Sequence, residues 1–310
     1  MWRHTILLCG ALAAAAAEAQ TLSGVSSGFV FDEQARALRV VVGVPGAAYL
    51  GSALESGLDA ASVSPDGSLA VTVRGHEASL VDLATGRTSL LGELDGTPSA
   101  FAWNADSVAV AASRLTRFRK LRSASPERTD LLAPASGVTA LALDAEGRVL
   151  AAAPDGIYVA DGSGPRLIEA APGITAIAIS GADLYVASTA RKQVLVTRRY
   201  AESPETSLVA GEASGLDTPV AVAGSPDGSL VYVADGTAKA VFAFRPATGE
   251  LVFRLDLDFM PSRLDRFHGS LFLLNSRASD SEPVQLFDAA QRAAYFVPAD
   301  DLSQAASVEE

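Results

Sequence analysis

The sequence predicts an all-β fold, a β-propeller of four-stranded antiparallel blades, from three observations. A turn such as Ser-Pro-Asp-Gly at residues 64–67 or 225–228 is followed by an apolar strand, and this motif returns at intervals of about forty residues. Hydrophobic residues make up 49% of the 310 residues, which is enough for a large core, yet aromatic residues make up only 6%. We therefore expect a core of small alanine, valine and leucine side chains in many layers.

Each repeat opens with two short apolar runs joined by a turn of the Asp-Gly or Ala-Asp kind, which is the pattern of a β-hairpin. A second pair of strands follows, joined by a polar turn, most clearly within residues 80–87 and 242–250. Four antiparallel strands in each repeat are typical of a propeller blade, whereas an immunoglobulin-type sandwich would not show such regular internal similarity. The opening pairs lie at residues 60–74, 100–113, 138–153, 174–188, 220–235 and 263–275.

Closure of the ring has two solutions in the sequence, six blades or seven. Residues 28–32 and 37–43 resemble the second half of a blade without its first half, which makes seven outer hairpins against six inner ones. With six blades, this hairpin would complete the last blade and remove exposed sheet edges. With seven, one blade is incomplete. The length from residue 28 to residue 299 covers nearly seven periods and favours seven blades.

The N-terminal segment is typical of a secretory signal peptide. Arg3 and His4 precede an apolar run over residues 6–12 and an alanine tract, and we expect cleavage after Ala19. A membrane anchor is the alternative, but the apolar stretch is shorter than the roughly 20 residues that a spanning helix needs. The sequence therefore predicts a periplasmic or secreted protein without an integral membrane span.

The predicted mature chain is acidic and free of cysteine. Cys9 is the one cysteine, and it follows Leu8 rather than the small residue of a lipoprotein signal, so we expect neither a lipid anchor nor disulfides. Cleavage removes one base and one acid, which leaves the net charge at −12 and disfavours a nucleic-acid partner. We expect a monomer with a signal peptide at 1–19, the propeller at 20–298 and an acidic disordered tail at 299–310.

Residues 218–235, which run on to residues 247–252, resemble the YVTN-type repeat of bacterial propellers, a group similar to lactonase-like and NHL propellers. Weaker copies occur at residues 157–162, 184–188 and 64–87. The resemblance implies structural roles for the motif: glycines make turns, prolines fix the start of strands, and tyrosine and valine fill the space between blades. The resemblance implies a WD40-like propeller fold and does not specify the function.

Lactonase-like and gluconolactonase-like propellers place His, Arg or metal-binding Glu, Asn and Asp around a central channel. After residue 19 this chain has two histidines, His76 and His268, and neither belongs to a His-x-His pair. His76 stands beside Glu77, which fits a general base held by a carboxylate but also an ordinary surface loop, the interpretation we favour. His268 falls in a turn on the opposite face. We therefore expect no catalytic residue, no metal site and no cofactor.

Asp66 and Asp227 recur in the Ser-Pro-Asp-Gly turns. Clustered carboxylates would suit calcium, a hard cation that prefers oxygen ligands. One such residue in a blade places the carboxylates far apart around a ring, however. We therefore expect them to stabilise their own turns through the Asx side chain.

A partly basic rim is predicted at the edge that follows the second strand of several blades, and it would suit carboxylate or phosphate groups on a partner. Asp155 and Asp235 take this position in the two remaining blades, so the ring is mixed, and scattered surface charge is the alternative. Residues 114–122 hold five bases, which either dock an anionic partner or cover a solvated outer strand. The candidate partner-binding residues are Arg74, His76, Arg114, Arg117, Arg191, Lys192 and Arg277.

These observations together predict an exported, rigid binding platform for a protein, peptide or glycan in the cell envelope. The alternative is a propeller hydrolase or lactonase with its site at the channel mouth, which requires polar groups that converge on the axis. A third possibility is a structural component of an envelope assembly, which would expose a large apolar patch.

Overall fold

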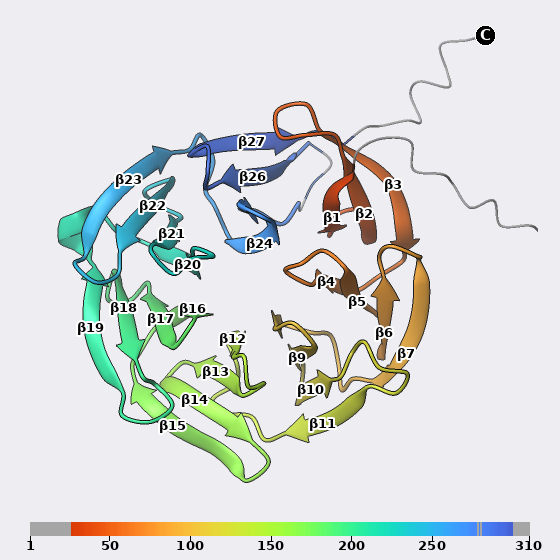
Figure 1. The fold of residues 1–310 in the computed structure, drawn as a ribbon, viewed down its shortest axis with the longest axis horizontal. Coiled ribbons are helices and arrows are strands. Elements are labelled where there is room, and N and C mark those ends of the chain that lie inside the picture. Colours follow the sequence, from red (N-terminus) through yellow and green to blue (C-terminus); the bar gives the residue numbers. More distant parts are fainter. Residues whose placement is uncertain (1–25, 278, 280, 300–310) are drawn as a thin grey trace, which may run out of the picture.

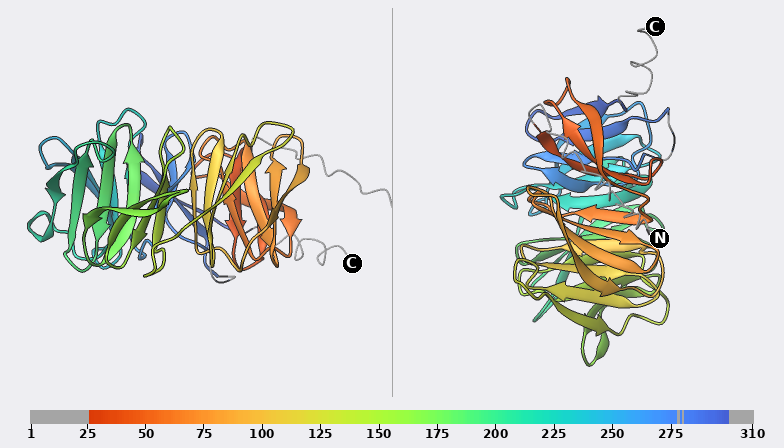
Figure 2. Two further views of the ribbon diagram at one scale, coloured as in Figure 1. Left: turned by 90° about the horizontal axis from the view of Figure 1, so that it is seen from below. Right: turned by 90° about the vertical axis from the view of Figure 1, so that its right-hand side faces the viewer.

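The structure, a computed structural model, describes residues 26–277, 279 and 281–299, and over these residues the chain forms seven β-sheets. The sheets stand around a central axis as the blades of a propeller, and the side views show a flat disc (Figures 1 and 2). Six sheets have four antiparallel strands and the first has three. The predicted propeller is confirmed, and the ring has seven blades rather than six.

Within each blade the strands follow one another in chain order, and the six predicted opening pairs are the first two strands of the second to seventh blades. A short 3₁₀ turn, Glu212–Ser214, precedes the sixth blade. The first four blades consist of β1 (Ser26–Asp32), β2 (Ala37–Val42) and β3 (Tyr49–Ser56); β4 (Ala60–Val63), β5 (Leu69–Arg74), β6 (Glu77–Asp82) and β7 (Arg87–Glu93); β8 (Ala100–Trp103), β9 (Ser107–Ala111), β10 (Leu115–Arg119) and β11 (Glu127–Leu131); and β12 (Ala140–Leu143), β13 (Val149–Ala153), β14 (Gly156–Asp161) and β15 (Gly164–Ala170). The last three consist of β16 (Ile174–Ser180), β17 (Asp183–Ser188), β18 (Gln193–Arg198) and β19 (Glu205–Ala210); β20 (Pro219–Gly224), β21 (Val231–Asp235), β22 (Ala240–Arg245) and β23 (Glu250–Asp256); and β24 (Asp265–His268), β25 (Leu271–Leu273), β26 (Val284–Asp288) and β27 (Ala293–Val297).

The Ser-Pro-Asp-Gly turns close the first hairpins of the second and sixth blades through their aspartates. Asp227 Oδ1 accepts hydrogen bonds from Ser225 Oγ at 2.6 Å and from Ser229 N at 3.1 Å, and Gly228 takes the left-handed φ of 70° that the turn needs. These hydrogen bonds lower the pKa of Asp227 to about 2. Asp66 makes the same contacts in the second blade. Both carboxylates stabilise their turns, as the sequence predicted.

The core lies between the blades, because each sheet is covered on both faces by its neighbours. All five residues of β13 and of β21 are buried, whereas the outermost strands, such as β23, are mostly exposed. Small side chains fill most of these layers, as the composition predicted. The sixth and seventh blades are the exception, since the ring centroids of Phe272 and Phe287 each lie 5.5 Å from that of Tyr232.

The two faces of the disc carry different connections. The turns between second and third strands and the links between blades share one face, here called the rim face, as hydrogen bonds from Leu94 N to His76 O and from Leu257 N to Lys239 O show, both 2.7 Å. The turns between first and second strands, including that at Asp227, lie on the other, here called the turn face.

The first blade is incomplete in the part of the chain that the structure describes. Its first turn lies on the rim face, because Leu58 N, in the link to the second blade, donates to Arg36 O at 2.9 Å. β1 therefore runs in the direction of a second strand, and β1, β2 and β3 are equivalent to the second, third and fourth strands elsewhere. Seven blades with one incomplete is thus confirmed. The expectation that residues 28–43 form the third and fourth strands of a blade is wrong, because they form the second and third strands. This hairpin also does not join the last sheet.

The ring is closed by contacts between the last and first blades. Arg277 Nη1 donates to Asp32 Oδ2 at 2.7 Å, and both side chains are almost fully buried. Gln34 N also donates to Arg277 O at 3.1 Å. On the outside, Leu50 of β3 forms a parallel bridge with Ala299, so Ala299 belongs to the propeller. The predicted signal peptide and residues 300–310 lie outside the described residues, and among those described no helix has the length and apolarity to cross a membrane.

Candidate functional site

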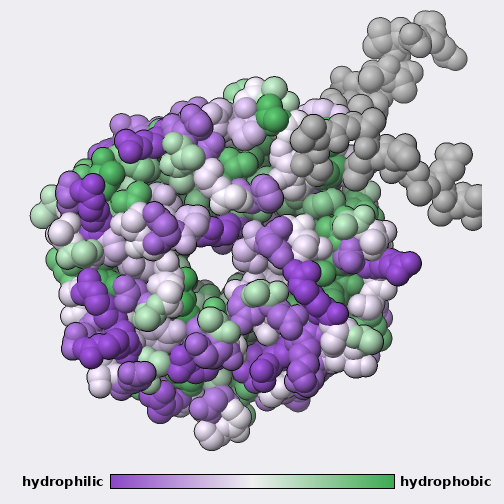
Figure 3. All heavy atoms as spheres, viewed as in Figure 1, coloured by the Kyte–Doolittle hydropathy of each residue, from purple (hydrophilic) through white to green (hydrophobic). Residues whose placement is uncertain are grey.

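A central channel of about 1190 Å³ runs along the propeller axis, and it opens at the middle of the disc (Figure 3). The first strands of the blades form its wall. Their channel residues are chiefly alanine, valine, leucine and isoleucine, because the first strands other than β24, which has the sequence DRFH, are short apolar runs. Polar residues surround the mouth that Figure 3 shows. The channel is therefore a concave surface that combines small apolar side chains with a larger share of polar atoms, and its charged groups are confined to a few places.

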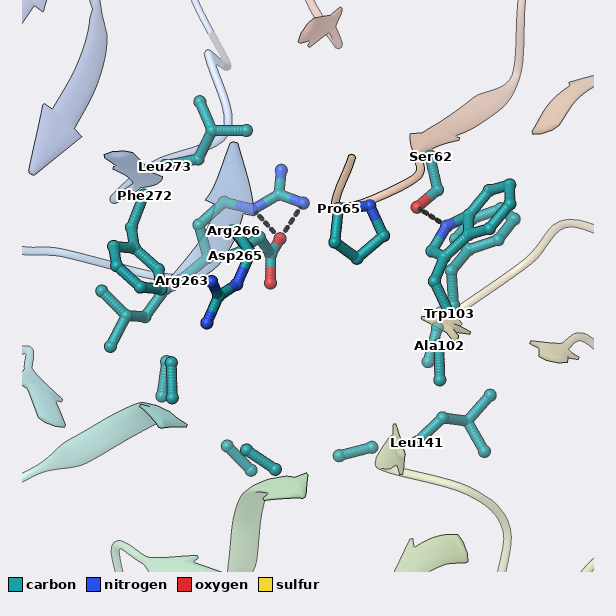
Figure 4. A pocket seen from close by; sticks show the side chains of 18 of the residues that line it. Ser62, Pro65, Ala102, Trp103, Leu141, Arg263, Asp265, Arg266, Phe272 and Leu273 are labelled. Carbon is teal, nitrogen blue, oxygen red and sulfur yellow. Dashed lines mark hydrogen bonds and ion pairs between the residues drawn. The ribbon is translucent and has the colours of Figure 1, made fainter. Parts of the chain in front are cut away.

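One charged cluster lies where the channel opens on the rim face. Arg36, in the turn after β1, forms an ion pair with Asp59, which also accepts a hydrogen bond from Gly75 N at 2.6 Å. Arg263 Nε donates to Asp265 Oδ2 at 2.5 Å across the start of β24 (Figure 4). The pairs are partly exposed to solvent, so each contributes little to stability and remains available to a ligand. Sequence reasoning missed this cluster because its members belong to three blades.

Aromatic groups form the second feature of the channel. Trp103, at the end of β8, donates through Nε1 to Ser62 Oγ at 2.9 Å, which orients its ring along the wall (Figure 4). Arg266 stacks over the ring of Phe272, with 5.4 Å between the guanidinium carbon and the ring centroid, and donates to Gly224 O at 3.0 Å. Burial lowers the pKa of Arg266. Stacking and hydrogen bonding together hold this cation against the wall.

Five of the seven candidate partner-binding residues lie on the rim face. Arg74 and His76 flank the turn between β5 and β6, Arg114 precedes β10, and Arg191 and Lys192 lie in the turn between β17 and β18. A hollow of about 530 Å³ lies beside these residues. His76 and Ser113, the residue before Arg114, line it together with acidic and small residues of the link between the second and third blades. Partner binding by these side chains stays a prediction.

Two of the four candidate cations on the rim face, Arg114 and Lys192, are paired with nearby acids. Arg114 Nε lies 2.6 Å from Asp95 Oδ2 in an exposed ion pair. Lys192 forms ion pairs with Asp217 and Glu212, and the hydrogen bond to Asp217 raises the pKa of Lys192. The ring is therefore mixed in charge, as the sequence indicated.

Two candidates lie elsewhere, which corrects the predicted rim. Arg117 is in the middle of β10 rather than in a loop, and its Nη1 donates to Gly147 O, 2.6 Å away on the turn face. Arg277 is buried in the closing ion pair with Asp32, so it presents no free cation at the rim. Residues 114–122 are likewise not an outer strand, because β11 covers β10 and Phe118 is fully buried. The alternation of side chains along β10 decides the outcome for Arg117 and Phe118, whereas the burial of Arg277 follows from its pairing with Asp32.

The acids expected at the rim of the other blades have structural roles. Asp155 accepts hydrogen bonds from Ser136 Oγ at 2.6 Å and Tyr158 Oη at 2.7 Å, which lower its pKa. Asp235 is fully buried and accepts three backbone hydrogen bonds. Among the residues that the structure describes, no group of three or more His, Cys, Asp or Glu side chains is arranged to hold a metal ion. His268 is exposed on the turn face.

Comparison with known proteins supports the fold and no narrower assignment. No protein-family model and no curated protein matches the sequence. A chain in the crystal structure of a nidogen/laminin complex is similar to this one, with a TM-score of 0.56 and 15% sequence identity over 72% of this chain and 90% of that chain. The propeller domain of Cps50 (Swd1) from Myceliophteria thermophila has a TM-score of 0.55 and 17% identity over 82% of this chain and 94% of that domain. The chain is thus a seven-bladed β-propeller similar to these two.

Proposed function

We propose that this protein is an exported binding platform of the YVTN-like kind, which holds a protein, peptide or glycan partner in the cell envelope. Export is supported by the basic residues, apolar run and small residues of the first nineteen positions. The YVTN-like assignment is supported by the sixth blade, where residues 218–235 supply the repeat's turn and strands.

The observation that carries the proposal is the channel mouth on the rim face. Paired charges around Arg36 and Arg263 border a concave channel lined by small apolar side chains and by polar groups, and such a combination can bind and orient a ligand. The blades hold this surface rigidly, so a partner loses little free energy to ordering of the platform. In the nidogen/laminin complex a chain of this fold takes part in a protein complex, which supports the same use by analogy.

The hydrolase alternative finds less support in the site. A general acid–base mechanism needs titratable groups that converge on one point of the channel. Its described wall contains no histidine. Of its three carboxylates, Asp59 and Asp265 each pair with an arginine, which leaves Glu33 without a second titratable group to act with. We therefore place binding first.

Site-specific photocrosslinking in cells that export the protein tests this function. A photoreactive residue at His76 or Arg191, both on the rim face, is expected to capture one discrete partner. The matched control is Leu208, an exposed residue of the outer strand β19. Adducts that are the same at Leu208 as at the rim positions would contradict the proposed surface. N-terminal sequencing of the mature protein, expected to start at Gln20, tests export separately.

A further inference from the structure

Among the residues that the structure describes, none forms a first strand in the first blade. β1 is equivalent to β21, because Asp32 Oδ1 accepts a hydrogen bond from Ala35 N at 3.1 Å just as Asp235 Oδ1 accepts one from Ala238 N at 2.9 Å. In both turns the next residue has a left-handed φ, which is 50° at Arg36 and 47° at Lys239. Over the described residues, β21 pairs with β20 and β22, whereas β1 pairs with β2 alone.

The free edge of β1 faces the channel directly. Phe29, Val30 and Phe31 line the channel. In the second to seventh blades a first strand pairs with the second strand on its channel side, although Phe272 and Leu273 of β25 also reach the channel. β1 also lies farther from the axis than β4 and β24 (Figure 1). Backbone N–H and C=O groups along such an edge are a template for one more strand.

We propose that an extended peptide of a partner chain binds at this place and pairs antiparallel with β1, as the first strand does in the other six blades. The inference rests on the proposed binding function and names the chemical class of the partner. It is a β-strand addition, in which main-chain hydrogen bonds supply the affinity and neighbouring side chains the specificity.

The side chains around the open place fit a strand of small apolar residues. Phe31 packs with Ala61 and Val63 of the second blade against one apolar cluster, and all three are only partly buried. The chain's own first strands show which residues fit such a position: β4 has the sequence AASV and β20 has PVAVAG. We therefore expect alanine, valine and serine in the bound segment.

The charged residues at the rim face indicate which charge the amino end of the bound peptide should carry. A strand antiparallel to β1 begins on the rim face, as β4 does, so its amino end lies beside the turn after β1. There Arg36 is paired with Asp59, and Arg263 with Asp265. The exposed Glu33 forms no ion pair within the described part of the chain. A cationic amino end, either the free amine or a basic side chain, complements this carboxylate.

Strand pairing can be tested with the full chain and synthetic peptides. The probe is a peptide with the sequence of β16, Ile174–Ser180, preceded by a lysine. Two derivatives carry N-methyl groups on alternate residues, one on the odd and the other on the even positions. Because only alternate N–H groups of a strand point to a given neighbour, one derivative should bind about as well as the parent and the other about tenfold more weakly.

Hydrogen exchange then locates the peptide. Amides of Phe29, Val30 and Phe31 that face the channel should exchange quickly in the free protein and become protected when the parent peptide binds. Glu33→Gln should raise the dissociation constant about threefold, while the matched change Glu77→Gln, in the neighbouring rim turn, should leave it unchanged.

Several outcomes would overturn the inference. Equal binding of the two methylated derivatives would exclude backbone pairing. Strong protection of the β1 amides before peptide is added would mean that this chain, or a second copy of it, already fills the place. If crosslinking at His76 succeeds while the peptide fails to bind, the proposed binding function is supported and only the strand-addition site is contradicted. If crosslinking fails while the peptide binds, the rim face is contradicted as the binding surface and the strand-addition site is supported.

Discussion

The ion pair that closes the ring is the contact whose removal should cost the most. Arg277 and Asp32 lie 245 positions apart in the sequence, and their exposed side-chain fractions are 4% and 0%. Arg277→Met keeps an unbranched apolar side chain at this position and removes the guanidinium group with its charge. The buried carboxylate of Asp32 then retains one cation, Arg39, whose Nη1 is 3.3 Å away and less well placed.

The magnitude follows from this burial. Removal of one partner of a buried ion pair typically destabilises a protein by about 3–5 kcal/mol, because the other charge stays buried without compensation. Arg39 offsets part of this for Asp32, while the hydrogen bond from Arg277 Nε to Glu282 O, 2.9 Å long, is lost as well. We expect a loss of about 3 kcal/mol, which for a chain of this size lowers the melting temperature by roughly 5 °C.

Urea unfolding and thermal melts of four proteins measure this effect: the parent chain, Arg277→Met, Asp32→Asn and the double variant. The double variant should be more stable than the sum of the single losses by at least about 1 kcal/mol, since neither Asp32 nor Arg277 leaves a charge behind and Arg39 keeps its hydrogen bonds to Gly51 O and Leu50 O. Arg263→Met is the matched control, because its ion pair with Asp265 is partly exposed and should be worth less than about 1 kcal/mol. A loss for Arg277→Met no larger than that of the control would refute the argument.

Three further changes test the turns, the packing and the channel. The pKa of Asp227 is lowered to about 2 in the folded chain, so its contribution to stability is present above the unfolded pKa of about 3.9 and is lost as the pH falls through 2. Asp227→Asn should therefore flatten the fall in melting temperature between pH 4 and pH 2. An unchanged profile of melting temperature against pH would contradict this. Gly224→Ala should cost about 1–3 kcal/mol in urea unfolding, because a Cβ at this position would lie 2.5 Å from the Cβ of Ser180 in the next blade. Trp103→Phe removes the 2.9 Å hydrogen bond to Ser62 and should cost about 1 kcal/mol without loss of the β-sheet circular dichroism, whereas a collapse of that signal would show a larger role in folding.

The candidate site was predictable only in part. Arg74, His76, Arg114, Arg191 and Lys192 could be placed on one face, since each follows the second strand of a blade and blade connectivity repeats. The list of charged positions could not show that Arg277 turns into the core or that Arg117 reaches the opposite face. A charged residue is expected at the surface, and a buried arginine becomes visible only when its carboxylate partner is known.

The charged pairs of the channel mouth were missed for a related reason. Arg36 and Asp59 belong to the first and second blades, and Arg263 to the link before the seventh. Each looks like an ordinary loop residue in the sequence. Only the closure of the ring places these segments around one opening.

By itself, the sequence determined the class of fold, the number of strands in a complete blade and the chemistry of its turns, because these depend on side-chain alternation and on hydrogen bonds between residues a few positions apart. Ser225, Asp227 and Ser229 form one such local unit. The tertiary structure alone decided the direction of β1, the open place beside it and the ion pair of Asp32 with Arg277. These features join the two ends of the ring, and no local propensity specifies which distant residues meet there.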